Sequence, residues 1–168
     1  MDYQLNGIEF NITNPNTVHF DKENLGLLDK NSLSKFRGDN VLYYGCGSGI
    51  LGILLLKYNL FNHINFMDID PLAIKYSKIN LINNNLDINK HTFSVIDILK
   101  KPIITNSKIY KYIICNPPQM PGPEELYEIR PDKYGGKDGL LFFMKIIDHA
   151  VSLNISKILF LQTSFSSF

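Results

Sequence analysis

The sequence contains few of the residues that bind metals or form disulfides. Its two cysteines, Cys46 and Cys115, both fall in apolar contexts where strands are expected to end. Two thiols at this separation do not form a zinc-binding pattern, and we expect no disulfide between them. The four histidines also lack the spacing of metal ligands, so we predict no metal site; they are His19, His63, His91 and His149.

Long hydrophobic runs and clusters of basic residues are absent too. No apolar run approaches the roughly 20 residues of a membrane-spanning helix, and the first residues, Met1-Asp2-Tyr3-Gln4, do not resemble a signal peptide. We therefore expect a cytoplasmic protein with no membrane partner. The net charge is only +1, whereas proteins that bind a nucleic-acid backbone usually carry a basic stripe. This disfavours nucleic acid as a direct substrate but keeps RNA as an alternative.

Strand and helix patterns alternate along most of the 168 residues, of which 45% are hydrophobic and 20% charged. This composition is ordinary for a globular domain, and we expect a single domain over 1–168, with 1–38 as a lead-in and 39–168 as the core. Strands are predicted over residues 8–12, 41–44, 64–67, 92–96, 110–115 and 157–161.

Helices are predicted between these strands. The Asp70-Pro71 pair is a strong helix start, since Asp caps the helix and Pro is favoured at its first position. The predicted helices comprise a leading helix with Leu25, Leu28 and Phe36, one over 50–58, one from Asp70 to the Asn83-Asn84-Asn85 run with Leu72, Tyr76 and Ile79 on one face, and one over 138–151 with Leu141, Met144, Ile147 and Val151 on its apolar face. Such alternation predicts a doubly wound, Rossmann-like α/β fold, with a mostly parallel sheet and helices on both faces.

A glycine-rich loop, Gly45-Cys46-Gly47-Ser48-Gly49, joins the strand at 41–44 to the next helix. Glycines allow a sharp turn and a close approach to a ligand, which in such sheets binds beyond the carboxyl ends of the strands. Asp68, 23 residues after Gly45, ends the next strand and is placed to accept hydrogen bonds from ribose hydroxyls. A turn without a ligand remains an alternative. The glycines at 47, 49 and 52 also match G-x-G-x-x-G, so spacing alone does not distinguish NAD from S-adenosylmethionine.

Asn116-Pro117-Pro118-Gln119 follows the strand at 110–115. Two prolines fix φ at about −65° and keep the preceding residue extended, so Asn116 is held towards the cleft. Hydrogen bonds from a planar amide or amino nitrogen to Asn116 Oδ1 and to the Pro117 carbonyl would orient the lone pair at a methyl group. Asn116 and Pro117 are therefore the candidate catalytic residues. The alternative is that the prolines merely end a strand.

These motifs together resemble those of class I S-adenosylmethionine-dependent methyltransferases. The first, second and third motifs are matched by 41–52, 67–73 and 95–99. Asn116-Pro117-Pro118 followed by the segment 135–140 is similar to HemK-like enzymes, which methylate glutamine in translation release factors. The resemblance covers about Ile8 to Leu161 and implies the class I fold, S-adenosylmethionine as cofactor and methylation of nitrogen.

Carried over by position, the resemblance gives each motif residue a role. The methionine part of the cofactor would lie along the glycine loop, and the adenosine would contact the next two strand ends. The implied contacts are Gly45, Cys46, Gly47 and Gly49 with methionine, Asp68 with ribose, Ile69, Asp97 and Ile98 with adenine, and Asn116 with the substrate nitrogen.

Three departures from the family pattern stand out. Tyr43 replaces an acidic residue near the methionine amine, and Gln119 replaces an aromatic residue that would stack on a planar substrate amide. The chain ends at Phe168, where the family fold continues with a helix and two more strands. We therefore expect a fragment, or a reduced domain whose sheet edge a partner protein covers.

The function expected first is methylation of a protein side-chain amide, glutamine foremost, as in a release factor. The alternatives within the same chemistry are an amino group of an RNA base and a small metabolite, and the change at Gln119 slightly favours a smaller or less planar acceptor. A different class is a non-catalytic, cofactor-binding scaffold subunit. An NAD-dependent enzyme is disfavoured because it would not explain Asn116-Pro117-Pro118.

Overall fold

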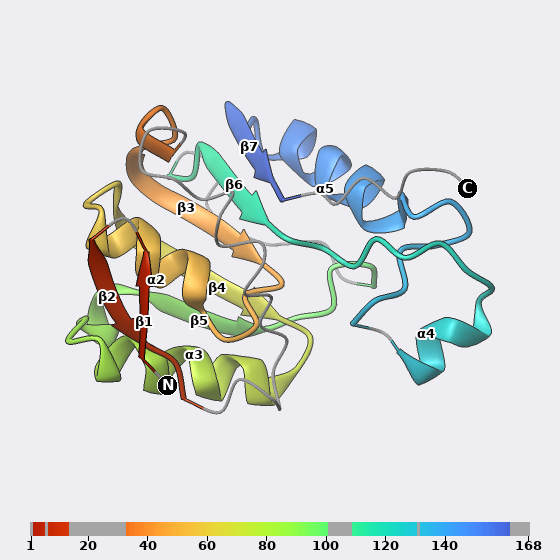
Figure 1. The fold of residues 1–168 in the computed structure, drawn as a ribbon. Helices are drawn as coiled ribbons and strands as arrows, with labels where there is room; N and C mark the ends of the chain where they lie inside the picture. Colours follow the sequence, from red (N-terminus) through yellow and green to blue (C-terminus); the bar gives the residue numbers. More distant parts are fainter. Residues whose placement is uncertain (1, 6, 14–32, 101–108, 131, 162–168) are drawn as a thin grey trace.

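A parallel five-stranded sheet forms the centre of the protein (Figure 1). The computed structural model describes residues 2–5, 7–13, 33–100, 109–130 and 132–161. The strands are β3 (Gly38–Tyr44), β4 (Phe61–Asp68), β5 (Thr92–Val95), β6 (Tyr112–Cys115) and β7 (Lys157–Phe160), in the order β5-β4-β3-β6-β7. The order reverses between β3 and β6, which makes the sheet doubly wound. The predicted fold class is confirmed.

Helices α2 (Ile50–Lys57) and α3 (Pro71–Asn83) lie on one side of the sheet, and α5 (Leu141–Ser152) lies on the other (Figure 1). The predicted cap of α3 is confirmed, because the Asp70 carboxylate accepts the Leu72 N–H at 2.8 Å. All three helices are followed at the same position by an asparagine with positive φ: Asn59, Asn85 and Asn154. Asparagine tolerates this conformation and so ends the helices cleanly.

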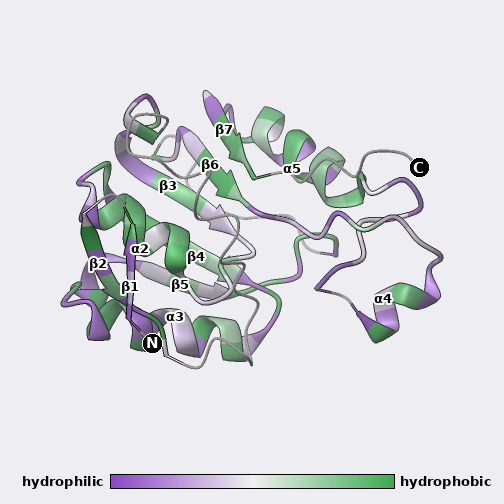
Figure 2. Cartoon of the chain, viewed as in Figure 1, coloured by the Kyte–Doolittle hydropathy of each residue, from purple (hydrophilic) through white to green (hydrophobic). Residues whose placement is uncertain are grey.

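An antiparallel hairpin of β1 (Asp2–Leu5) and β2 (Ile8–Asn11) packs beside α2 and α3 (Figure 1). Phe10 and Ile12 are buried in the same apolar cluster as α2. Helix α2 is therefore covered by the hairpin as well as the sheet, which explains why Figure 2 shows it as hydrophobic along its length. The strand at 8–12 was predicted, but its partner β1 was not.

Two apolar clusters occupy the two faces of the sheet, because successive side chains of a strand point to opposite faces. Val41 and Tyr43 of β3 face α2 and the larger cluster, whereas Leu42 and Tyr44 face α5 and the smaller one. The strands predicted near 41–44 and 64–67 are longer in the structure. Parallel pairing extends them to Gly38 and Phe61, which are partners in the register.

The predicted inner faces of α3 and α5 are wrong. In α3 the residues that face inwards are Ala73, Ile74, Ser77, Asn80 and Leu81. In α5 they are Ile146, His149 and Ala150, whereas Met144 and Val151 are 54% and 77% exposed. Each helix has two rows of residues at helical spacing. The row that packs on the sheet is the one with the smaller or more polar side chains.

Other differences concern helix ends and short elements. Helix α5 begins at Leu141 rather than 138, because Gly139 has φ 78° and lies outside the helix. A five-residue helix, α4 (Glu125–Ile129), and a 3₁₀ turn, η2 (Ile88–Lys90), were not predicted. Most of the predicted leading helix, including Leu25 and Leu28, lies outside the described residues, and Phe36 is buried just before β3. Among the described residues, no helix is both long and apolar enough to cross a membrane.

Candidate active site

The glycine loop leads from β3 into α2 at the carboxyl edge of the sheet. Gly45, Gly47 and Gly49 have φ values of 62°, 51° and 82°, a region that other residues rarely adopt. A Cβ at Gly45 would meet no atom of the described residues within 4 Å, whereas one at Gly49 would lie 3.2 Å from Ser77 of α3. The loop is therefore packed on α3 at Gly49 and open at Gly45, the side from which a ligand can approach.

Asp68 ends β4 beside this loop. Its carboxylate accepts the Gly47 N–H at 2.8 Å and the Asp70 N–H at 3.0 Å. Burial raises the pKa of Asp68 above its ordinary value, although these two hydrogen bonds act in the opposite direction. A carboxylate has about four acceptor positions, so capacity for hydroxyl donors remains.

The next strand end brings Asp97 to the same edge, since Ile96 N–H donates to the Asp68 carbonyl at 2.8 Å. Asp97 Oδ1 accepts the Leu99 N–H at 2.9 Å. Asp97 Oδ2 is buried without a hydrogen-bond partner among the described residues, although it forms an ion pair with Lys100 Nζ at 3.5 Å. Buried acceptors are usually hydrogen-bonded, and the amino group of an adenine is a suitable donor for this one.

Apolar groups flank these acceptors. Ile69 is 50% exposed directly after Asp68, and Ile98 packs partly buried against the smaller cluster. The open glycine turn fits the methionine part of S-adenosylmethionine. The adenosine part fits the remaining acceptor capacity of Asp68, the buried Asp97 oxygen without a hydrogen bond among the described residues, and the exposed Ile69.

Asn116 follows β6, the strand on the other side of β3. Tyr44 and Cys115 are register partners, so Gly45 and Asn116 leave the sheet side by side. The Asn116 side chain is half-buried, and no described residue forms a hydrogen bond with it. The glycine loop, Asp68, Asp97 and Asn116, which are far apart in the sequence, thus meet at one edge.

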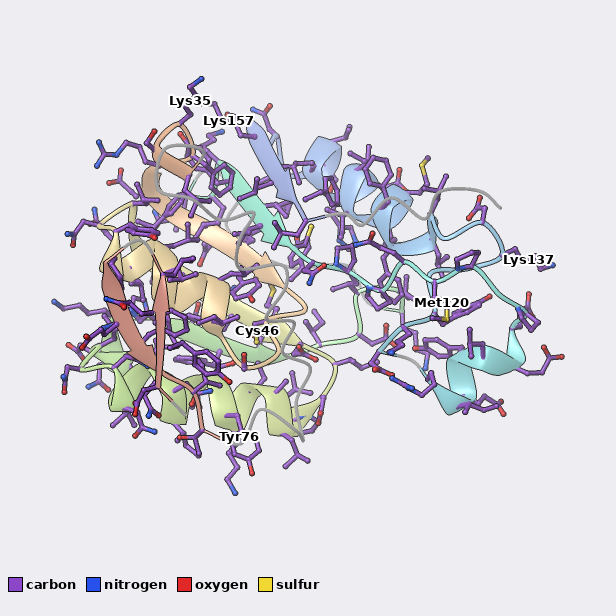
Figure 3. All side chains as sticks on the ribbon, viewed as in Figure 1. Lys35, Cys46, Tyr76, Met120, Lys137 and Lys157 are labelled. Atoms are coloured by element: carbon purple, nitrogen blue, oxygen red, sulfur yellow. The ribbon has the colours of Figure 1, made fainter. Side chains whose placement is uncertain are left out.

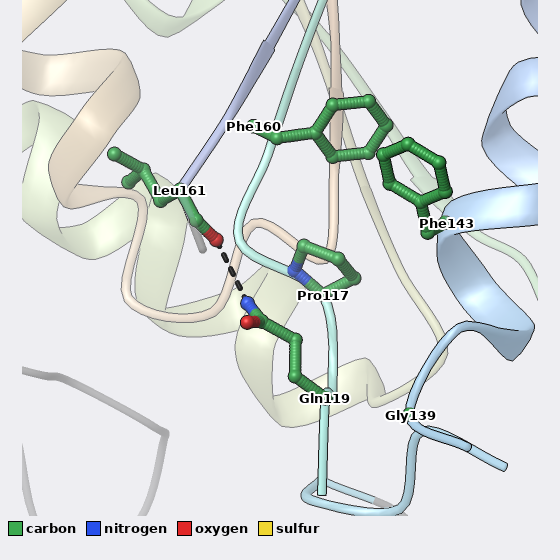
Figure 4. A pocket seen from close by; sticks show the side chains of 6 residues that line it. All are labelled: Pro117, Gln119, Gly139, Phe143, Phe160 and Leu161. Atoms are coloured by element: carbon green, nitrogen blue, oxygen red, sulfur yellow. Dashed lines mark hydrogen bonds between the residues drawn. The ribbon is translucent and has the colours of Figure 1, made fainter. Parts of the chain in front are cut away.

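Pro117 and Gln119 line a small pocket with Gly139, Phe143, Phe160 and Leu161 (Figure 4). Gln119 Nε2 donates to the Leu161 carbonyl at 2.8 Å, and the rings of Phe143 and Phe160 lie 4.7 Å apart. Gln119 therefore connects the segment after β6 to the end of β7. The family pattern has an aromatic residue at the position of Gln119.

Tyr43, the residue that replaces an acidic residue of the family pattern, lies in the hydrophobic core. It is 2% exposed, and its ring lies 5.7 Å from that of Phe66 on the α2 side of the sheet. Burial raises its pKa well above the ordinary value, and a hydrogen bond from the backbone of Leu51 acts against this. Tyr43 therefore brings no charge to the position where the family pattern has an acidic residue.

Sequence reasoning missed the residues of α3 that support the loop. The Cys46 side chain lies inside, with Sγ 3.2 Å from Ser77 Oγ (Figure 3). Ser77 donates to the Gly47 carbonyl at 3.1 Å, and Asn80 Nδ2 donates to the Ser48 carbonyl at 2.9 Å. The available signal was the polar residues at 77, 80 and 84, which share one helical face.

Comparison with known proteins agrees with this geometry. The model of the methyltransferase small domain family matches residues 20–130, about two thirds of the chain. A ribosomal RNA small subunit methyltransferase C from Photobacterium profundum is 33% identical over 109 residues, covering 65% of this chain and 30% of the relative. A release factor glutamine methyltransferase from Clostridium acetobutylicum is 33% identical over 109 residues, covering 60% of this chain and 37% of the relative. The chain thus spans about a third of the length of these relatives.

A solved structure shares the fold. It is the tRNA (uracil-54, C5)-methyltransferase of Pyrococcus abyssi in complex with S-adenosyl-L-homocysteine, with a TM-score of 0.54 at 20% identity over 88% of this chain and 37% of that one. Strand order, the open glycine loop and the family match all agree. The protein belongs to the methyltransferase small domain family of class I methyltransferases, whose cofactor is S-adenosylmethionine.

Proposed function

We propose that the protein methylates a planar nitrogen and that Asn116 holds the acceptor. The observation that carries this proposal is the position of Asn116. Its half-buried side chain leaves the sheet beside Gly45, and no described residue uses its hydrogen-bonding groups. An amide oxygen so placed is suited to accept an N–H from a substrate.

S-adenosylmethionine supplies an electrophilic methyl group on a sulfonium sulfur. In our proposal Gly45, Cys46, Gly47 and Gly49 surround its methionine part, and the Asp68 carboxylate accepts from the ribose. Ile69 and Ile98 contact the adenine, while Asp97 Oδ2, which is buried and has no hydrogen-bond partner among the described residues, accepts from the adenine amino group.

Asn116 Oδ1 and the Pro117 carbonyl each accept one N–H of the acceptor. This fixes the plane of the acceptor group and directs the nitrogen lone pair, so catalysis depends mainly on positioning. The two prolines limit movement of both acceptor atoms.

A protein side-chain amide is our first choice of acceptor. The segment 120–140, which follows the Asn-Pro-Pro element, contains three glutamates and two aspartates but only one arginine and two lysines. This local negative charge suits a phosphate backbone poorly. Similarity to a release factor glutamine methyltransferase also supports an amide. Similarity to a ribosomal RNA methyltransferase favours an RNA amino group as the second candidate.

The test is single-turnover methyl transfer from labelled S-adenosylmethionine to a release factor, to RNA and to a metabolite extract. We expect transfer to the release factor, and loss of one positioned hydrogen-bond partner in Asn116→Ala should lower the rate by about 10²–10³. Affinity for S-adenosylhomocysteine should stay within a few fold, because Asn116 acts mainly in the transition state.

Asn62→Ala is the matched control, since Asn62 is exposed at the opposite end of β4. Full activity of Asn116→Ala on the acceptor would refute the role of Asn116. A wild-type chain that binds S-adenosylhomocysteine but methylates none of the three acceptors would favour a scaffold subunit.

A further inference from the structure

Asn80 lies between two segments that are distant in the sequence. Its side chain is fully buried. Nδ2 donates to the Ser48 carbonyl of the glycine loop at 2.9 Å, and Oδ1 accepts the Thr13 N–H, just after β2, at 2.8 Å. One carboxamide group thus holds the glycine loop and the N-terminal hairpin at the same time.

The neighbouring polar residues of α3 each hold only one of these segments. Ser77, one turn earlier, donates to the Gly47 carbonyl at 3.1 Å. Asn84, one turn later, accepts the Asn11 N–H at 3.0 Å and donates to the Asn11 carbonyl at 2.7 Å, as a paired strand would. The row Ser77, Asn80 and Asn84 therefore runs from the loop to the hairpin, with Asn80 in contact with both.

These contacts determine which way the loop peptides point. In a trans peptide the carbonyl and the following N–H point in opposite directions. Because α3 holds the Gly47 carbonyl, the Ser48 N–H is directed away from α3. The N–H groups of Cys46, Gly47 and Gly49 donate within the protein. The Ser48 N–H is therefore the loop donor that this arrangement directs away from α3, where it is suited to an anionic group such as a carboxylate.

A buried amide is costly unless both of its ends are paired. If α3 only packed against the loop, an apolar side chain at position 80 would serve as well. The cost is balanced here because one side chain satisfies a backbone carbonyl and a backbone N–H on separate segments.

We propose that Asn80 is a positioning residue of the cofactor loop and that it couples the β1–β2 hairpin to cofactor binding. Order in the loop then favours order in the hairpin, and by linkage the docked hairpin raises affinity for the cofactor. This proposal rests on the assignment of the loop to S-adenosylmethionine.

The experiment measures S-adenosylhomocysteine affinity by calorimetry and hydrogen exchange of residues 8–13 with and without the ligand. In the wild type, the ligand should slow exchange at 8–13. Ser77→Ala loses contacts with the loop but none with the hairpin, and Asn84→Ala loses contacts with the hairpin but none with the loop. Each variant also loses one hydrogen bond within α3, to the Ala73 carbonyl and to the Asn80 carbonyl respectively. A neutral hydrogen bond corresponds to about 2- to 12-fold in affinity, so Ser77→Ala should weaken binding by about that factor.

Asn80→Ala should weaken binding at least as much as Ser77→Ala and abolish the protection of 8–13 by the ligand. Asn84→Ala, which serves as the destabilised control, should lower the melting temperature and weaken binding less than Asn80→Ala, because it loosens the hairpin but leaves the contacts of Ser77 and Asn80 with the loop in place. If Asn80→Ala does not fold, the hydrogen exchange of the wild type and the affinities of Ser77→Ala and Asn84→Ala still test the proposal.

Equal losses of affinity in Asn80→Ala and Asn84→Ala would show that Asn80 is merely structural. A wild type that binds the ligand without added protection at 8–13 would overturn the coupling alone. A wild type that does not bind S-adenosylhomocysteine would overturn the cofactor assignment, and this proposal with it.

Discussion

Two carboxylates lie only two residues apart at the end of β4, yet they have different roles. Asp68 is mostly buried and contacts the glycine loop, whereas Asp70 caps α3. We expect Asp68→Ala to weaken S-adenosylhomocysteine binding by about 10- to 150-fold, equivalent to about 1.5–3 kcal/mol for hydrogen bonds to a charged group. Calorimetry measures this change.

Asp70→Ala is the matched control. It should leave affinity within a few fold and lower the free energy of unfolding by about 1 kcal/mol, the usual cost of a lost helix cap. If the two variants lose equal affinity, Asp68 is not the ribose ligand. Because Asp68 also accepts the Gly47 N–H, Asp68→Asn, which keeps an acceptor for that bond, should retain more affinity than Asp68→Ala.

At the scale of elements, Gly52 determines how closely α2 approaches β4. A Cβ at this position would overlap the Phe66 ring. That ring is buried among Tyr43, Phe93 and His91, so it has little room to move. The third glycine of the G-x-G-x-x-G match is therefore explained by helix–sheet packing, without a dinucleotide.

We expect Gly52→Ala to lower the free energy of unfolding by about 1–3 kcal/mol, the typical cost of overpacking a core. Phe66→Leu should relieve the overlap, so the double variant should lose less stability than the two single losses combined. Urea denaturation of the four proteins in the cycle measures this. If the losses of unfolding free energy in the two single variants simply add in the double variant, Gly52 and Phe66 do not restrict each other.

At the scale of the whole molecule, His91 makes stability depend on pH. Its Nδ1 accepts the Ile64 N–H at 3.3 Å, and burial, with a smaller effect of His63, lowers its pKa to about 4. In the unfolded chain a histidine binds a proton near pH about 6.5. Between these values the unfolded state holds more protons, so stability falls as the pH falls from 6.5 to 4.

The melting temperature should therefore fall more steeply from pH 7 to pH 5 in the wild type than in His91→Asn. The carboxamide oxygen of the variant preserves an acceptor for Ile64 but does not titrate. Asp68, whose pKa is raised, acts in the opposite direction because its contribution to stability is lost as pH rises. His63 and His149, whose pKa values are lowered by burial, add to the acid loss. All three remain in both proteins, so the difference in slope reports His91, and parallel slopes would contradict the prediction.

Local patterns were enough to predict the doubly wound sheet and the cap at Asp70, since glycines, apolar runs and Asp-Pro act within a few residues. The hairpin was missed although Asn6-Gly7 is a strong turn signal between β1 and β2. The inner faces of α3 and α5 were predicted wrongly, because each helix has two rows of residues at helical spacing and only packing on the sheet determines which row is buried. Asn80 was beyond local reasoning because its partner Thr13 is 67 residues away.

The segment 117–140 leaves the sheet after Asn116 and projects as an arm that carries α4 (Figure 1). The ends of the arm are fastened together, since the Met120 N–H donates to the Lys133 carbonyl and the Gly135 N–H to the Met120 carbonyl, both at 2.8 Å. Gly135 and Gly139 also pack directly on the Gln119 backbone. These contacts close the base of the arm, and α4 is joined to the base where the Tyr127 ring packs on that of Tyr134. Under the role that we propose for Asn116, substitutions at the exposed side chains of α4 would alter the arm while its closed base keeps Asn116 in place, so a new acceptor could be acquired without rebuilding the site around Asn116.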